Sequence, residues 1–254
     1  MARPAGEPVA IVTGGGRGIG LAIGQALATD GYRIVVVDVN GEAAEAAARQ
    51  LREGGAPDAV GYQADVREYA RAQEIVADVL GRFGRIDALV NNAGITSPKP
   101  FLELTEADWD LVLGVHLKGS FNWSHAAAPA MVAAGWGRIV CISSMNAKTG
   151  GAFPAVSKTA YAAAKAGMLG LIRGLARDLA PAVTANAICP GLIKTELSAS
   201  MWDSPRFGAV IESIPAGRLG LPEDIANAVA FLVSDKASYI SGEALDVNGA
   251  VYID

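Results

Sequence analysis

The sequence has few cysteines, no excess of basic residues and no long uninterrupted apolar run. Two cysteines among 254 residues exclude a disulfide framework and favour a reducing compartment. The net charge of −5 and the absence of a basic cluster argue against a nucleic-acid partner. Charged residues or glycines interrupt every apolar stretch, and residues 1–8 lack the apolar core of a signal peptide, so no membrane segment is expected. We therefore expect a cytoplasmic protein that binds neither membranes nor nucleic acids.

The composition is typical of a well-packed globular protein. Apolar residues make up 51% of the chain and charged residues 19%, and glycine contributes 30 positions. Such a chain is long and apolar enough to bury a sizeable core. Cys141 and Cys189 are most simply read as small buried residues.

Seven short apolar runs predict strands, and stretches with helical spacing separate them. The runs are Val9–Thr13, Arg33–Asp38, Ala59–Gln63, Ala88–Asn91, Arg138–Ser143, Thr184–Ile188 and Ala244–Val247. The helical stretches include Ile19–Asp30, Glu42–Arg52, Arg67–Arg82 and Thr105–Ala134. Alternating strands and helices predict an α/β fold, a doubly wound parallel sheet of the Rossmann type with about seven strands and helices on both faces. We expect residues 1–254 to form one domain with its ligands at the carboxyl ends of the strands.

A glycine-rich turn follows the first predicted strand. Strand, turn and helix in this order direct backbone N–H groups and a helix N-terminus at a diphosphate. A side chain at Gly14, Gly18 or Gly20 would obstruct the turn, the ligand or the helix packing. Asp38 ends the second strand about 20 positions further on, where a carboxylate accepts hydrogen bonds from ribose hydroxyls. The alternative is an ordinary glycine turn with a solvated aspartate.

Tyr161 and Lys165 are spaced to share one face of a helix. An ammonium about 4 Å from the phenol, at an effective dielectric constant near 20, favours the phenolate by about 4 kcal/mol before desolvation. The tyrosine pKa would then fall from about 10 by roughly two to three. The alternative is a pair on an ordinary surface helix.

Several motifs together resemble the short-chain dehydrogenase/reductase family. The loop Thr13–Gly20 has the spacing G-x-x-x-G-x-G, and Asp65, Asn91–Gly94, Ser143 and Ser144, Tyr161–Lys165 and Pro190–Thr195 follow in the family's order. The resemblance runs from about residue 8 to the end of the chain and implies oxidoreduction between a nicotinamide cofactor and a substrate. It implies no metal site. The cofactor-binding residues it implies are Gly14, Arg17, Gly18, Ile19, Gly20, Asp38, Asp65, Val66, Asn92, Ala93, Gly94, Tyr161, Lys165, Pro190, Gly191, Ile193 and Thr195.

The resemblance also assigns catalytic roles. Tyr161 is expected to act as the base, or as the acid in the reverse direction. Lys165 is expected to lower the pKa of this tyrosine and to bind the nicotinamide ribose. Ser144 is expected to hold the substrate oxygen. We choose Ser144 over Ser143 because the family's catalytic serine is the second of this pair.

Two positions depart from the family pattern. His116 stands where the family has an asparagine that holds a proton-relaying water. Its main-chain carbonyl could bind that water, its imidazole could titrate and relay the proton, or it could be a packed core histidine. The interval from Ser144 to Tyr161 is also longer than usual, so residues 146–158 should form a loop over the substrate. Lys148 and Lys158 in that loop either contact an anionic or hydroxyl-rich substrate or are solvated.

The irregular stretch from about Leu197 to Arg218 is long for a connection and reads as a substrate lid. For the cofactor, Asp38 would repel the 2′-phosphate of NADP, whereas Arg17 resembles a basic residue of some NADP-using relatives. We predict NAD, with NADP as the weaker alternative.

Three functions remain open from the sequence. The first is an NAD-dependent dehydrogenase of a small-molecule secondary alcohol such as a polyol, sugar or hydroxy acid. The second is a 3-oxoacyl thioester reductase, acting for example on acyl-carrier-protein substrates. The third is a non-catalytic dinucleotide-binding regulator. Family members are commonly homotetramers, and we expect the same here.

Overall fold

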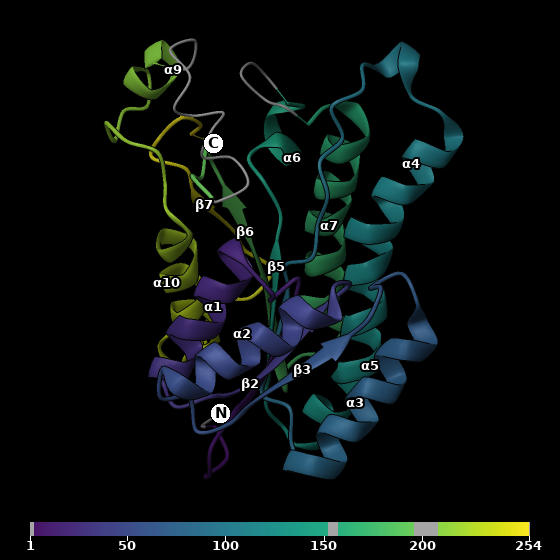
Figure 1. Cartoon of the computed structure of the whole chain (residues 1–254), viewed down its shortest axis with the longest axis vertical. Helices are drawn as coiled ribbons and strands as arrows, with labels where there is room; N and C mark the ends of the chain where they lie inside the picture. The colour runs from purple at the N-terminus through teal and green to yellow at the C-terminus, as the bar shows by residue number, and fades with distance from the viewer. Residues whose placement is uncertain (1–2, 152–156, 196–207, 254) are drawn as a thin grey trace.

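The computed structural model describes residues 3–151, 157–195 and 208–253. Its seven strands form one parallel sheet in the order β3-β2-β1-β4-β5-β6-β7 (Figure 1). The strands are β1 Val9–Thr13, β2 Arg33–Asp38, β3 Ala59–Gln63, β4 Ala88–Asn91, β5 Gly137–Ile142, β6 Val183–Pro190 and β7 Ala244–Val247. The predicted doubly wound sheet is therefore confirmed, with β5 shifted by one residue and β6 longer at both ends.

Helices cover both faces of the sheet, with α1, α2 and α10 on one side and α3, α4, α5 and α7 on the other (Figure 1). The α-helices are α1 Gly18–Thr29, α2 Gly41–Glu53, α3 Tyr69–Phe83, α4 Glu106–Leu113, α5 Gly119–Ala133, α6 Asn146–Thr149, α7 Thr159–Asp178, α9 Gly208–Glu212 and α10 Pro222–Val233. Short 3-10 turns occur at Phe101–Glu103 and Asp235–Ala237. None of the helices in the described ranges is long and apolar enough to cross a membrane.

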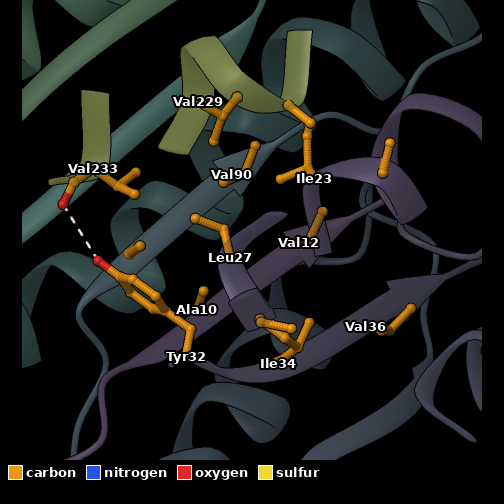
Figure 2. Close-up of a cluster of buried hydrophobic side chains, with 14 of the residues drawn as sticks. Ala10, Val12, Ile23, Leu27, Tyr32, Ile34, Val36, Val90, Val229 and Val233 are labelled. Atoms are coloured by element: carbon orange, nitrogen blue, oxygen red, sulfur yellow. Dashed lines mark hydrogen bonds between the residues drawn. The ribbon is translucent and has the colours of Figure 1, made fainter. Parts of the chain in front are cut away.

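The strands read as continuous apolar runs because successive side chains enter two different cores. Ala10 and Val12 of β1 face the α1, α2 and α10 side, whereas Val9 and Ile11 face the other side. Figure 2 shows Ile23 and Leu27 of α1 with Ala10, Val12 and Ile34 of the sheet, and the Tyr32 hydroxyl donating to the Val233 carbonyl at 3.3 Å. Both cysteines, Cys141 and Cys189, are buried and free.

The predicted helix Thr105–Ala134 is divided into α4, a π-helical segment η2 over Gly114–Lys118, and α5. Its predicted start is confirmed, because Thr105 and Asp108 form a capping box. A π turn adds a residue to the helical repeat and rotates the side chains that follow. The π turn carries His116, so the change of helix type falls at the position that departs from the family pattern.

The first half of the predicted lid lies outside the described residues, which omit 196–207. From residue 208 onward, α9 is followed by a chain that returns to α10 (Figure 1). Val210, Ile214 and Leu219 form a small apolar cluster of their own. That residues 1–254 constitute a single domain stays a prediction.

Candidate active site

The glycine turn joins β1 to the N-terminus of α1. Gly14 and Gly18 have φ of 61° and 54°, a left-handed region that favours glycine. A Cβ on Gly20 would lie 2.1 Å from the Gly14 carbonyl oxygen, so the helix approaches the turn too closely for any side chain. Arg17 caps α1 without a side-chain hydrogen bond, and no acid lies in its first turn. The first N–H groups of α1 are thus left for an anion, which fits a cofactor diphosphate.

A pair of side chains fastens the turn to the end of β4. The Thr13 hydroxyl accepts hydrogen bonds from the N–H groups of Asn92 and Ala93 at 3.0 and 3.2 Å. The Asn92 side chain donates to the carbonyls of Thr13 and Gly14, both at 3.0 Å. The side chain of Asn92 therefore holds the turn itself. Thr13 was missed as a site residue, although a polar residue ending a buried strand was a signal for it.

Asp38 lies beside the same turn. Its carboxylate accepts from Gly16 N–H at 3.1 Å and from Asn40 N–H at 3.0 Å. A Cβ on Gly16 would stand 2.9 Å from the Asp38 Oδ2. The negative charge is thus held at the carboxyl end of β2 next to the predicted diphosphate site, while the Arg17 side chain is exposed.

Asp65 is already paired within the chain. The Arg67 guanidinium donates to both carboxylate oxygens, with Nε at 3.0 and 2.9 Å, and holds the Asp65 pKa below its usual value. The neighbouring Val66 carbonyl accepts from the Asn122 side chain at 3.0 Å. Arg67 was expected to begin a helix, but α3 begins at Tyr69 because Arg67 belongs to the turn that holds Asp65.

Tyr161 on α7 lies next to Ser144, which follows β5. Burial raises the Tyr161 pKa above its ordinary value, and it outweighs the hydrogen bond with Ser144, which lowers that pKa. The Ser144 hydroxyl oxygen accepts from Asn146 N–H at 3.1 Å. The Ser143 hydroxyl instead donates to the Lys165 carbonyl at 2.9 Å. The structure thus brings Ser144, and not Ser143, to the phenol.

The predicted fall of the Tyr161 pKa is wrong, because burial raises that pKa, and the contribution of the Lys165 charge to the phenolate stays a prediction. The Lys165 ammonium lies 5.4 Å from the centre of the Tyr161 ring, and it donates at 2.6 Å to the Ile142 carbonyl. Burial lowers the Lys165 pKa to about 8. The two residues share a helix face as expected, but desolvation dominates both pKa values.

His116 is buried and packs edge-to-face on Tyr161, with ring centres 5.0 Å apart. Its Nε2 lies 2.9 Å from the Ile95 carbonyl oxygen and 3.2 Å from the Ile95 nitrogen, while Nδ1 is buried without a partner. A Cβ on Gly94 would lie 2.6 Å from the imidazole. Burial, together with the charge of Lys165, lowers the His116 pKa to about 3. The His116 imidazole is therefore neutral near pH 7, which argues against the alternative in which it titrates and relays the proton.

The main-chain carbonyl of His116 accepts from the Ser120 hydroxyl at 2.7 Å. The same carbonyl also accepts from the backbone N–H of Gly119, so both of its lone pairs have donors within the chain. Whether His116 takes part in proton transfer stays a prediction.

The segment after β6 closes the other side of the site. Gly191 N–H donates to the Val247 carbonyl at 3.0 Å, and a Cβ on Gly191 would lie 2.7 Å from Asn248 Cα. The Thr195 side chain approaches Gly18 of the glycine turn. Pro190 ends β6 and Ile193 lies between Gly191 and Thr195, so the predicted cofactor residue that the structure brings to the turn here is Thr195.

One of the two loop lysines, Lys148, differs from expectation, whereas the role of the Lys158 side chain stays a prediction. Lys148 lies in α6, and its ammonium forms an ion pair with Asp246 of β7 at 2.8 Å. Its side chain is therefore bound within the protein and is neither solvated nor directed at a substrate. Lys158 precedes α7, and its N–H donates to the Ser97 carbonyl at 2.9 Å. Within the described ranges, no group of three or more histidines, cysteines or acids could hold a metal ion.

Comparisons with known proteins agree with this geometry. A family model described as "Enoyl-(Acyl carrier protein) reductase" matches residues 14–251. The chain belongs to the short-chain dehydrogenase/reductase family. It is therefore an oxidoreductase that uses a nicotinamide cofactor and a small-molecule substrate.

Two relatives match this dehydrogenase/reductase along almost its whole length. The acetoacetyl-CoA reductase of Rhizobium meliloti is 41% identical over 245 residues, covering 96% of this chain and 98% of the relative. The 3-oxoacyl-[acyl-carrier-protein] reductase FabG of Escherichia coli is 37% identical over 246 residues, covering 96% and 97%. The crystal structure of gox2181 has a TM-score of 0.90 at 35% identity, covering 96% of this chain and 95% of that one.

Proposed function

We propose that this protein interconverts 3-oxoacyl and 3-hydroxyacyl thioesters, preferentially coenzyme A thioesters, with NAD(H). The full-length similarity to an acetoacetyl-CoA reductase, combined with the adjacency of Ser144 and Tyr161, carries this proposal. It replaces the polyol or sugar dehydrogenase expected first, because the two relatives described above are named for thioester substrates.

The protonation state of Tyr161 supports the reductive direction. When bound, the nicotinamide cofactor supplies or accepts the hydride. Because burial raises the Tyr161 pKa, the phenol keeps its proton at neutral pH and is ready to donate it to a carbonyl oxygen. In the oxidative direction the same residue must be the base, and the charge of Lys165 then helps to stabilise the phenolate.

The hydrogen bonding of Ser144 supports its role at the substrate oxygen. Its Oγ accepts from Asn146 N–H, so the hydroxyl hydrogen, which bonds with Tyr161 in the protein alone, is the group that would donate to a substrate oxygen. A donor aimed at the oxygen where charge develops stabilises the transition state.

The cofactor is held by the N-terminus of α1, the glycine turn and the segment after β6. Asp38 supports NAD(H), because its carboxylate adjoins the turn and would repel a 2′-phosphate.

A second candidate is an NAD-dependent dehydrogenase of another secondary alcohol. Asp38 favours it, since oxidation draws on NAD. Its substrate would reach the same Ser144 and Tyr161.

One assay separates these functions. Cofactor absorbance would be followed with acetoacetyl-CoA and NADH, with the same acyl group on a carrier protein, and with a panel of polyols and hydroxy acids and NAD. We expect turnover of acetoacetyl-CoA, and a loss of about 100- to 10,000-fold in Tyr161→Phe. Tyr239→Phe, a fully exposed tyrosine, is the matched control. Turnover of polyols alone would favour the second candidate, and cofactor binding without turnover would indicate a regulator.

We also propose a homotetramer. Leu111 on α4 and Phe121 and Val132 on α5 are exposed large apolar side chains, suited to burial against another subunit. Light scattering coupled to size-exclusion chromatography measures the mass directly, and a monomer would contradict the proposal.

A further inference from the structure

A chain of buried polar contacts joins the Ser144 turn to the start of the Tyr161 helix. We propose that Asn146 and Ser157 are positioning residues that hold Ser144 and Tyr161 in register during turnover. The proposal deepens the oxidoreductase function proposed above and rests on it.

Asn146 forms the first link. Its backbone N–H donates to the Ser144 hydroxyl oxygen at 3.1 Å, and its side-chain Nδ2 donates to the Ser157 carbonyl at 3.3 Å. The Asn146 side chain is buried. One residue therefore both orients the Ser144 hydroxyl and reaches the chain four positions before Tyr161.

Ser157 forms the second link. Its hydroxyl accepts from Ser97 N–H at 3.0 Å, and the adjacent Lys158 N–H donates to the Ser97 carbonyl at 2.9 Å. Ser97 and Ser157 are buried. Both main-chain polar groups of Ser97 are thus bound by the two residues that precede α7.

The same segment reaches His116 at its other end. Ile95, two residues before Ser97, lies against the imidazole Nε2, and that ring packs on Tyr161. The phenol is therefore flanked by a continuous path from Ser144 through Asn146, Ser157 and residues 95–97 to His116.

The length of the loop explains why such a clamp is useful. Seventeen positions separate Ser144 from Tyr161, and a longer connection leaves its ends more freedom to move apart. Buried hydrogen bonds are costly to leave unmade, so they hold the two ends. Displacing a reacting group by about 1 Å costs on the order of 100-fold in rate.

The test combines two variants, a rescue and a control. Asn146→Ala removes the side-chain bond but keeps the N–H that serves Ser144, and Ser157→Ala removes the acceptor for Ser97. Ser157→Thr retains a hydroxyl. Ser241→Ala is the control, because its hydroxyl also accepts a backbone N–H, from Ala185 at 3.3 Å, at the opposite end of the sheet.

We expect kcat for acetoacetyl-CoA to fall about 10- to 100-fold in Asn146→Ala and in Ser157→Ala. The Kd for NADH should change less than twofold, and Ser157→Thr should restore most of the rate. Turnover should be unchanged in Ser241→Ala. Loss of thermal stability with unchanged kcat would mean that both residues are merely structural, and would overturn the proposal.

Hydrogen exchange separates this proposal from the function on which it rests. Ser157→Ala should speed exchange of the Ser97 amide in the protein with NADH bound, whichever substrate is used. If the wild-type protein is inactive on thioesters but Ser157→Ala still speeds exchange of the Ser97 amide, only the proposed substrate is refuted. Unchanged exchange and unchanged turnover on any active substrate would refute the clamp.

Discussion

The Lys165 ammonium donates a 2.6 Å hydrogen bond to the carbonyl of Ile142, the last residue of β5. This contact fixes the cation at the carboxyl end of β5, beside the Tyr161 ring. Burial lowers the Lys165 pKa to about 8, so at neutral pH the side chain remains charged in the protein alone. The site thus keeps a buried cation where the proposed reaction places negative charge.

Replacing this cation should reduce turnover strongly. Lys165→Met removes the charge that stabilises the developing phenolate, and we expect kcat to fall at least about 100-fold. Steady-state kinetics would measure the loss, with Lys236→Met, an exposed lysine, as the control. Equal turnover in the two variants would show that the charge of Lys165 is not used.

Neutralising Asp38 should weaken the preference for NAD(H). Asp38→Asn keeps an oxygen that can accept from Gly16 or Asn40 N–H but removes the repulsion of a 2′-phosphate. That repulsion is worth about 1 to 4 kcal/mol at 4 Å, so the ratio of kcat/KM for NADPH over NADH should rise at least about fivefold. The ratio is measured with one substrate and both cofactors. An unchanged preference for NADH would contradict the role of Asp38.

A methyl group in the glycine turn should weaken cofactor binding. In Gly20→Ala the new Cβ would lie 2.1 Å from the Gly14 carbonyl oxygen, so the turn must shift away from the end of β4. We expect NADH to bind at least about tenfold more weakly in a fluorescence titration. Gly174→Ala on α7 meets nothing within 4 Å and should instead add about 0.5–1 kcal/mol of stability. Equal NADH affinity in both variants would argue against the close approach at Gly20.

His116 should make the protein sensitive to acid. Its pKa is about 3 in the folded protein against 6.5 when exposed, so the unfolded chain binds the proton first and folding stability falls as pH drops below 6.5. The loss reaches about 2 kcal/mol at pH 5. His116→Asn lacks this dependence, and urea denaturation at pH 7 and pH 5 would compare the two proteins. The same loss in both would mean that another group is responsible.

Much of the fold could be read from local sequence pattern. Strands covered by helices on both faces are mainly apolar, and the short apolar runs placed β1, β2, β3, β4 and β7 at their observed bounds. The capping box at Thr105 and the glycine turn are also local signals, because each depends on residues a few positions apart.

The partners of the site residues depended on the tertiary structure. Asn92 holds a turn 78 positions away, and Ser157 accepts a bond from Ser97, 60 positions away. No periodic pattern links such residues; sheet register and helix packing bring them together. The π turn at His116 could not be predicted from the sequence, because no periodic pattern marks it either.

The sequence by itself determined the order of the elements, the parallel sheet and the residues at its carboxyl edge, because these follow from hydrophobic periodicity and from glycines that leave no room for a side chain. Only the tertiary structure decided that Lys165 bonds to Ile142, that Lys148 pairs with Asp246, and that burial controls the pKa values of the site. Desolvation depends on everything packed around a group, which the spacing of two residues on a helix does not contain.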